Sequence, residues 1–189
     1  MGDQAHRPSR LILVKHGSPQ IEPGQPRSQW SLSDQGRADA ASLARKLASF
    51  APDRLVCSPE PKASETASII GGVLGLAPQL DIDLREQEAD HNPFVSQAEF
   101  ERQVAEMFAR PDELMLGEET GLAARLRFGR TLERLQEASA PVIVAHGRVI
   151  TLWLSDQLGI EPMAFWERLG LGTAAIVSMP GGSIEFVDP

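Results

Sequence analysis

Residues 11–19 read Leu-Ile-Leu-Val-Lys-His-Gly-Ser-Pro, and this stretch decides the fold. Four aliphatic residues bounded by polar ones are typical of a short strand that is buried on both faces in a parallel sheet. Gly17 then allows the backbone to turn sharply and to approach a ligand closely. His16 is therefore expected at the carboxyl end of a core strand, where open α/β sheets bind their ligands.

The same pattern recurs far downstream, in residues 141–147, which read Pro-Val-Ile-Val-Ala-His-Gly. Of the four histidines in the chain, His16 and His146 both follow an apolar run and precede a glycine. Because the whole context recurs, we interpret both as functional residues rather than as histidines that end two ordinary strands. His6 is expected in a loose arm over residues 1–9, and His91 in a loop.

Apolar periodicity along the rest of the chain alternates between strands and helices. Further strands are expected over 10–14, 54–57, 80–84 and 141–145, and helices over 33–50, 59–74, 96–110, 120–138, 149–158 and 162–169. Residues 174–177 and 183–187 flank a Pro-Gly-Gly turn and predict an antiparallel hairpin. The expected fold is a single α/β domain over 1–189, a three-layer sandwich with a mostly parallel central sheet flanked by helices and the C-terminal hairpin at an edge.

Capping residues give the expected helix starts. Ser33 and Ser96 are predicted N-caps, the latter in a capping box with Glu99. Ser58 is predicted to cap the second helix, with Pro59 at its first position. In the helix over 120–138, the inward face is predicted to carry the leucines at 122, 126, 132 and 135.

Composition excludes several classes of partner. The net charge is −8, which argues against binding to nucleic acid or to an anionic membrane, and no apolar run has membrane-spanning length. The single cysteine, Cys57, precludes an internal disulfide and fits a reducing compartment, and the N-terminus lacks a signal-peptide pattern. A cytoplasmic location is expected, whereas the oligomeric state is left open.

The chemistry suggested by these residues is phosphoryl transfer. An imidazole at a strand end is a good nucleophile towards phosphorus when its other ring nitrogen is fixed, and the resulting phosphohistidine can be hydrolysed in a second step. The transferred group needs positive charge around its oxygens, for which Lys15, Lys62, Arg148 and His146 are candidates. The leaving alkoxide needs a proton donor, such as a carboxylic acid of raised pKa.

Several segments also resemble the histidine phosphatase superfamily, the phosphoglycerate mutase-like proteins. Residues 15–17 resemble its Arg-His-Gly signature, and residues 58–67 resemble its Ser-Pro-x-x-Arg-Ala-x-x-Thr-Ala segment. Residues 84–86 are similar to its Leu-x-Glu acid motif, and residues 145–147 to its second histidine motif. These motifs occur in the family's order over nearly the whole chain, so the resemblance is specific.

The resemblance implies roles for individual residues. His16 would be the phosphorylated nucleophile, Glu86 the proton donor, with Asp83 and Glu88 as rivals, and His146 a second histidine that binds phosphate. Gly17 would lie beside the phosphate. Glu22 falls where many members have a phosphate-contacting asparagine, and a carboxylate there would oppose phosphate.

Lysine replaces both motif arginines, at Lys15 and Lys62. Arginine holds two phosphate oxygens with a planar fork, whereas lysine is a point charge. The exchange predicts either a retuned or a weakened pocket, and Arg148 is a candidate to restore a guanidinium.

The expected function is a cofactor-independent phosphomonoesterase that acts on a small phosphorylated substrate, with a phosphoprotein as an alternative. Mutase activity is less favoured because the chain is short. A catalytically weakened phosphate- or protein-binding member of the same fold is the second reading. A metallohydrolase using His16, His91 and His146 is the third, but no His-x-His or His-x-x-x-His pair supports a metal site.

Overall fold

The computed structural model describes residues 8–91 and 95–189. Within them, six strands form one sheet in the order β3-β2-β4-β1-β5-β6. The strands are β1 (Arg10–Lys15), β2 (Arg54–Cys57), β3 (Gln79–Leu80), β4 (Pro141–Ala145), β5 (Ala174–Ser178) and β6 (Ile184–Val187). Pairing is parallel from β1 through β4 and β2 to β3, and antiparallel from β1 to β5 and from β5 to β6. The predicted mostly parallel sheet with a C-terminal hairpin at its edge is confirmed.

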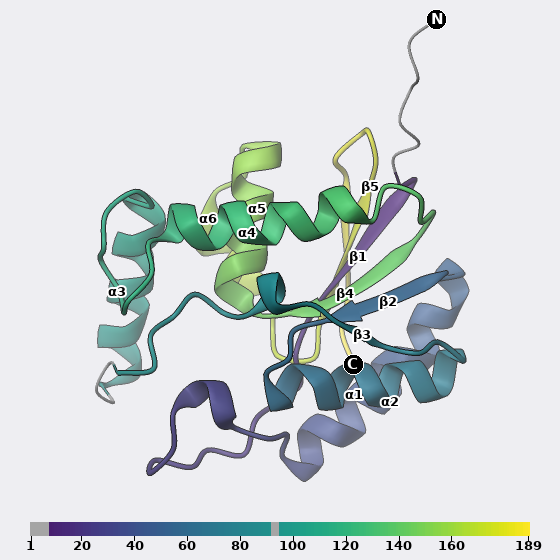
Figure 1. Ribbon diagram of the computed structural model, residues 1–189, viewed down its shortest axis with the longest axis horizontal. Coiled ribbons are helices and arrows are strands. Elements are labelled where there is room, and N and C mark those ends of the chain that lie inside the picture. The colour runs from purple at the N-terminus through teal and green to yellow at the C-terminus, as the bar shows by residue number, and fades with distance from the viewer. Residues whose placement is uncertain (1–7, 92–94) are drawn as a thin grey trace, which may run out of the picture.

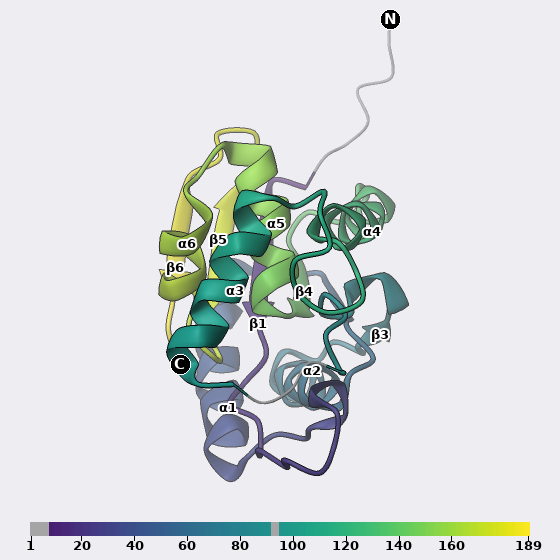
Figure 2. The same ribbon diagram turned by 90° about the vertical axis from the view of Figure 1, so that its left-hand side faces the viewer.

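Helices cover both faces of this sheet (Figure 1). They are α1 (Asp34–Leu47), α2 (Pro61–Leu74), α3 (Gln97–Ala109), α4 (Gly121–Arg134), α5 (Gly147–Leu158) and α6 (Pro162–Arg168). The helices α1 and α2 lie below the sheet in Figure 1 and α4 and α5 above it, which gives the predicted three layers. Figure 2 looks at the end of the molecule where α3 stands, beyond the carboxyl ends of β1 and β4.

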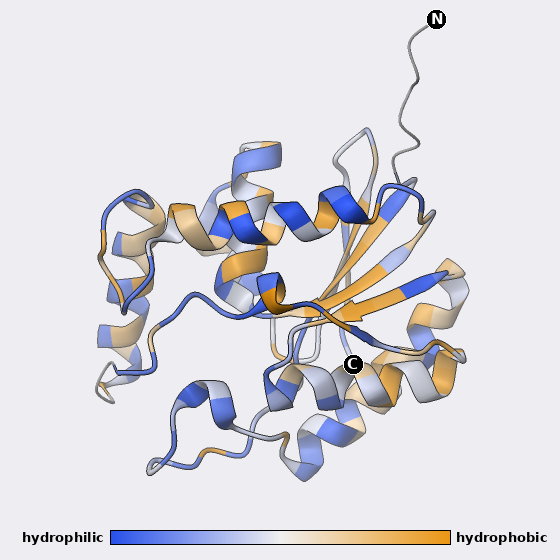
Figure 3. Ribbon diagram, in the orientation of Figure 1, coloured by the Kyte–Doolittle hydropathy of each residue, from blue (hydrophilic) through white to orange (hydrophobic). Residues whose placement is uncertain are grey.

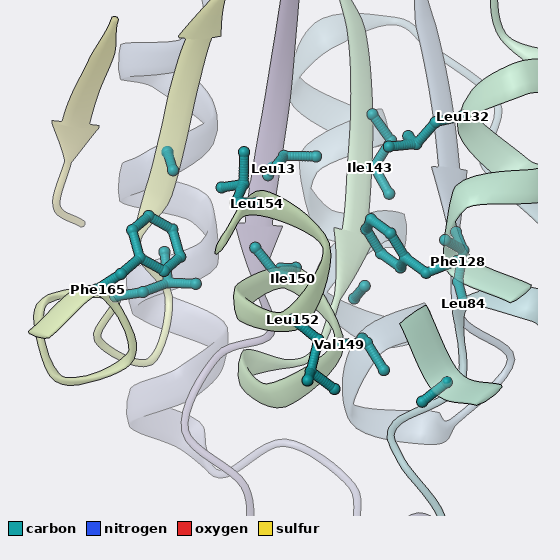
Figure 4. Packing of buried hydrophobic residues seen from close by; sticks show 14 of the residues in the cluster. Leu13, Leu84, Phe128, Leu132, Ile143, Val149, Ile150, Leu152, Leu154 and Phe165 are labelled. Atoms are coloured by element: carbon teal, nitrogen blue, oxygen red, sulfur yellow. The ribbon is translucent and has the colours of Figure 1, made fainter. Parts of the chain in front are cut away.

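The central strands are continuous apolar runs because both of their faces are buried. Figure 3 shows these strands mostly in the orange of hydrophobic residues. In β1, Leu11 and Leu13 face one cluster of buried residues, whereas Ile12 and Val14 face the other. Figure 4 shows Leu13 and Ile143 packed under Phe128 of α4 and Ile150 of α5. Each such side chain contributes about 1.5–3 kcal/mol when it is fully buried, so both faces hold the strand in register.

The start of α2 differs from the sequence prediction. Ser33 and Ser96 cap α1 and α3 as expected, each accepting from the third residue that follows it. The second helix instead begins at Pro61, with Glu60 as its N-cap residue. The reason is that the Ser58 N–H still donates to Val144 O at 3.0 Å, which continues the sheet by one residue beyond β2.

The segment around residue 82 is also not the predicted strand. Only Gln79–Leu80 pair as a strand, and Asp81 then caps a 3-10 turn over Ile82–Leu84. The carboxylates of Asp81 and Asp83 are turned towards the arginines of α4. This ion pairing overrides the alternation of apolar and acidic residues in the sequence.

The predicted inward face of α4 is wrong at Leu126, which is 55% exposed. The helix is rotated so that Arg127 and Phe128 are buried instead. A buried arginine requires partners, and Arg127 has a carboxylate and several backbone carbonyls around it. The spacing of hydrophobic residues in the sequence does not reveal that a buried arginine and its partners are needed here.

Candidate active site

A cavity of about 680 Å³ opens at the carboxyl ends of β1, β2 and β4. Its walls come from segments that are far apart in the sequence: the ends of these strands, the loop before α1, the segment after Leu84, and the helices α3 and α5. The site residues expected from the sequence that line it are Lys15, His16, Lys62, Glu86, His146 and Arg148. The fold therefore brings together six of the seven residues that the sequence singled out.

His16 follows β1 directly, and its backbone N–H still donates to Ala145 O at 3.0 Å. Its Nδ1 lies 2.8 Å from Gly17 O, and since a carbonyl only accepts, this nitrogen carries the proton. The tautomer leaves a lone pair on Nε2. Burial holds the pKa of His16 well below its ordinary value, and electrostatic interactions with His146 and with the ammonium group of Lys62 act in the same direction, so the ring is neutral at pH 7.

His146 lies beside it, with the two ring centroids 5.1 Å apart in an edge-to-face arrangement. Its Nε2 is 2.9 Å from Ser58 Oγ and 3.4 Å from Glu60 Oε1. Burial lowers the pKa of His146 well below its ordinary value, although the charge of Glu86 opposes the shift. Its Nδ1 is buried and has no hydrogen-bond partner in the described part of the chain.

Both lysines are held by hydrogen bonds inside the protein, and neither is an exposed surface residue. Lys15 Nζ donates to Leu169 O at 2.9 Å and lies 5.5 Å from the centroid of the Trp166 ring. Burial lowers the pKa of Lys15, and the charge of Glu86 counteracts this only in part. Lys62 is buried and donates to Arg27 O at 2.8 Å and to Glu60 Oε2 at 2.6 Å.

Glu86 is held by the first turn of α5. Its carboxylate accepts from the backbone N–H groups of Arg148, at 3.3 Å, and Val149, at 3.2 Å, and also from its neighbour Gln87. Burial favours the protonated form, but the charges of Arg148 and His146 and the bond from Gln87 prevail and lower the pKa of Glu86. The raised pKa expected of a proton donor is therefore not found for Glu86 in this structure.

The rival acids are placed differently from Glu86. Asp83 forms ion pairs with Arg130 and Arg134 and is not among the residues that line the cavity. Glu88 lines the cavity, but its side chain is 46% exposed and pairs with Arg85. Of Glu86 and Glu88, which both line the cavity, Glu86 is thus the more enclosed and the more precisely oriented.

Gly17 is the one expected site residue that does not line the cavity. Its N–H donates to Thr66 Oγ1 at 3.0 Å. A Cβ at this position would lie 2.7 Å from Gly36 O, so the close approach of α1 requires a glycine here. Glu22 also lies away from the cavity wall, where its carboxylate accepts from Gln25.

Two charged residues of the site were not anticipated from the sequence. Glu60 is buried beside Lys62 and His146, and its Oε1 accepts from the Glu86 N–H at 2.8 Å. Arg127 donates to Glu119 through two nitrogens and to the carbonyls of Asp83, Arg85 and Glu86, which fixes the segment that carries Glu86. The only sequence signal for Glu60 is its place between the Ser-Pro pair and Lys62.

Metal ligation finds no support in the geometry. Within residues 8–91 and 95–189, no group of three or more histidine, cysteine, aspartate or glutamate side chains is arranged to hold a metal ion. His91 Nδ1 lies 3.1 Å from Glu118 Oε1, and His6 lies outside the described residues.

Among the described residues, no helix has the length and apolar character needed to cross a membrane.

The fold and the site together define the class of protein. It is an α/β protein in which two histidines at strand ends line one cavity at the carboxyl edge of the sheet. Residues 11–185 match the sequence profile of the histidine phosphatase superfamily, branch 1, and the chain belongs to this family. The resemblance seen in the sequence motifs is thereby confirmed at the level of the superfamily. A comparison with curated proteins gave no match.

Solved structures show the same fold at low sequence identity. Mycobacterial glucosyl-3-phosphoglycerate phosphatase has a TM-score of 0.73 at 21% identity, over 96% of this chain and 97% of that one. The alpha-ribazole phosphatase from Shigella flexneri has a TM-score of 0.69 at 20% identity, over 95% of each chain. YhfR from Bacillus stearothermophilus has a TM-score of 0.71 at 20% identity, again over 95% of each chain.

Proposed function

We propose that this protein is a phosphomonoesterase that hydrolyses a small phosphorylated substrate through a phosphohistidine on His16. The observation that carries the proposal is the state of the His16 ring. Its Nδ1–H is bound to Gly17 O, its pKa is lowered by burial, and it lines the cavity. A neutral imidazole with a fixed tautomer offers the Nε2 lone pair as a nucleophile at neutral pH.

The surroundings of His16 supply what a phosphoryl group needs. Lys15 and Lys62 both lower the pKa of His16 through their charges, so they act electrostatically at this ring. Positive charge in an enclosed site stabilises the oxygens of the transferred group. His146 adds a ring nitrogen that has no partner among the residues the structure describes, and Arg148 adds a guanidinium to the cavity wall. These residues support dianion binding in a protein of negative net charge.

The reaction proceeds in two steps. His16 Nε2 attacks phosphorus while the bond to the leaving oxygen breaks, and the leaving oxygen takes a proton from Glu86. Water then attacks the phosphohistidine and gives its proton to Glu86, which releases inorganic phosphate and restores the His16 lone pair. Glu86 must therefore be protonated when the substrate is bound.

We attribute the protonation of Glu86 to the binding of the substrate. Glu86 by itself is ionised at neutral pH because positive charges and backbone N–H groups surround it. A phosphate dianion placed beside it is a like charge, which raises the pKa of a carboxylate. The proton for the leaving group is accordingly taken up with the substrate.

Similar structures support the phosphatase reading. Two of them are described as phosphatases of glucosyl-3-phosphoglycerate and of alpha-ribazole. The mycobacterial protein has also been solved with VO3 and with inorganic phosphate. We propose that the present protein likewise acts on a phosphorylated small molecule, without a metal cofactor, because lysine, arginine and histidine supply the positive charge.

A non-catalytic phosphate-binding module is the second candidate. The observation in its favour is that Glu60 already neutralises Lys62. Trapping distinguishes the two functions: quenching with alkaline detergent during turnover of a phosphate monoester should leave an acid-labile, base-stable phosphoryl group on His16, and His16→Ala should neither trap phosphate nor turn over. Phosphate binding without any trapped intermediate would establish the module instead, and loss of activity on chelation would point to a metal.

A further inference from the structure

Two guanidinium groups in the wall of the cavity lie over one aromatic ring. The Cζ atom of Arg27 is 5.1 Å from the ring centroid of Phe100, and that of Arg148 is 5.9 Å from it. The three side chains come from the loop before α1, from α3 and from α5, and all line the same cavity as His16. The fold thus gathers two positive charges at one place from segments that are distant in sequence.

Such a gathering is costly unless an anion offsets it. Burial and then the charge of Arg148 lower the pKa of Arg27, which means that the two arginines repel each other. Asp90 acts in the opposite sense on Arg27, but its carboxylate also accepts from the N–H and the hydroxyl of Ser28. A ligand anion that contacts both guanidiniums would turn this repulsion into two charge-assisted hydrogen bonds.

Arg148 has a donor ready for such an anion. Its Nη2 donates to Gln87 O at 3.0 Å, and its Nε lies 3.5 Å from Glu86 Oε2. Its Nη1, in contrast, is buried and has no hydrogen-bond partner among the described residues. A buried charged donor without an acceptor in this part of the chain is unfavourable, and an anion in contact with Nη1 would satisfy it.

The arginines are distinct from the lysines that surround His16. The charges that lower the pKa of His16 are those of His146, Lys62 and Lys15. Arg148 acts on Glu86, His146 and Arg27 instead. Because Glu86 is the proposed donor to the leaving oxygen, a guanidinium beside it lies on the side of the leaving group.

We propose that Arg27 and Arg148 form a second anion subsite, and that the substrate is a phosphate monoester whose leaving group carries a further carboxylate or phosphate. This inference rests on the proposed function, and it reassigns Arg148 from the transferred phosphate to the leaving group. Both guanidiniums lie against the same Phe100 ring, so a single anion at this place would bridge them.

Matched esters test the subsite. Simple alkyl phosphates are compared with the same esters that end in a carboxylate or in a second phosphate, over a range of chain lengths. At the best length, the terminal anion should raise kcat/KM about tenfold or more, as expected for one charge-assisted hydrogen bond. The carboxylate and phosphate series show which anion is preferred.

A charge-removing variant locates the effect. Arg27→Met should bring the ratio of kcat/KM between charged and uncharged esters close to unity. Arg45→Met removes an exposed arginine from α1, outside the cavity, and should leave the ratio at its wild-type value. A ratio near unity in the wild-type protein, or an unchanged ratio in Arg27→Met, would overturn the proposal.

Binding to a protein that cannot turn over separates this proposal from the phosphatase function. Calorimetry with His16→Ala should show about tenfold tighter binding of the charged ester, and the difference should vanish in His16→Ala/Arg27→Met. If this difference is seen but wild type hydrolyses no ester, the phosphatase proposal fails and the subsite stands. Hydrolysis without any preference, or no difference in binding, would refute the subsite.

Discussion

The carboxylate of Glu60 lies 2.6 Å from the ammonium group of Lys62, and both side chains are more than nine-tenths buried. The same carboxylate accepts from the Glu86 N–H and lies near His146 Nε2. One acidic residue thus connects three residues that the sequence assigns to the site. Glu60 already matches the charge of Lys62, so a phosphate that binds Lys62 must share this ammonium group with Glu60.

Removing the Glu60 charge should destabilise the protein in a way that phosphate reverses. In Glu60→Gln, Lys62 would be a buried cation without its anion, which costs about 3 kcal/mol. Urea unfolding should show this loss, and saturating inorganic phosphate should recover part of it, because the anion takes the place of the carboxylate. Glu65→Gln breaks a pair with the exposed Arg37, so its loss should stay below about 1 kcal/mol. Equal losses in the two variants would contradict a structural role for the buried pair.

The sequence predicted the sheet and the position of the two histidines because both depend on short-range signals. A run such as residues 11–14 is buried on both faces wherever it lies in a parallel sheet, and His16 and His146 follow from the strand ends. Helix caps at Ser33 and Ser96 are equally local. These features need no knowledge of what packs against them.

The charged contacts of the site could not be predicted in this way. Glu60 is unremarkable in sequence, and its environment is set by Lys62, Glu86 and His146 together. Arg127 replaces an expected leucine on the buried face of α4 because backbone carbonyls of a distant segment need donors. Such partners are fixed by the tertiary fold, and periodicity does not encode them.

Restoring the motif arginines should lower activity. The side chains of Lys15 and Trp166 both pack closely against Gly147. A Cβ added to Gly147 would lie 3.1 Å from Lys15 Cε and 3.1 Å from Trp166 Nε1, so little free space remains around Lys15. The wider guanidinium of Lys15→Arg would be overpacked there, at a cost of about 1–3 kcal/mol. We expect kcat/KM on a simple phosphate monoester to fall about tenfold or more in Lys15→Arg.

Lys62→Arg should behave similarly, because Lys62 is enclosed by Glu60 and the carbonyl of Arg27. Lys46→Arg on the exposed surface of α1 is the matched exchange and should leave kcat/KM unchanged. A large gain of activity in Lys15→Arg/Lys62→Arg would show instead that the lysines weaken an arginine site.

Stability should fall as the pH drops below about 6.5, the ordinary pKa of histidine. The pKa values of His16 and His146 are both far lower in the folded protein, so in this range the unfolded chain binds protons that the folded chain does not. Each histidine then contributes up to about 1.4 kcal/mol per pH unit, and none of this loss is present above about pH 7.

Urea unfolding from about pH 8 to pH 5 measures this slope, and His16→Asn should make it shallower. The lowered pKa of Glu86 adds a loss only at lower pH, as this carboxylate becomes protonated in the unfolded chain. A pH-independent stability between about pH 7 and pH 5 would show that the two rings are not kept neutral by burial.

The strongest test of Glu86 is its dependence on the leaving group. In Glu86→Gln the amide oxygen still accepts from one of the two N–H groups of α5, but no proton is available for the leaving oxygen. Alkyl phosphates have strongly basic leaving groups and should lose about a hundredfold to ten-thousandfold in kcat, the usual contribution of a general acid. The leaving group of an aryl phosphate such as p-nitrophenyl phosphate departs without protonation, so the kcat for this substrate should fall far less.

Glu88→Gln provides the control, because Glu88 lines the same cavity but is half exposed and pairs with Arg85. Equal losses of kcat on both substrates in Glu86→Gln would mean that Glu86 positions Arg148 and α5 without donating a proton, and a selective loss in Glu88→Gln would transfer the role to that residue.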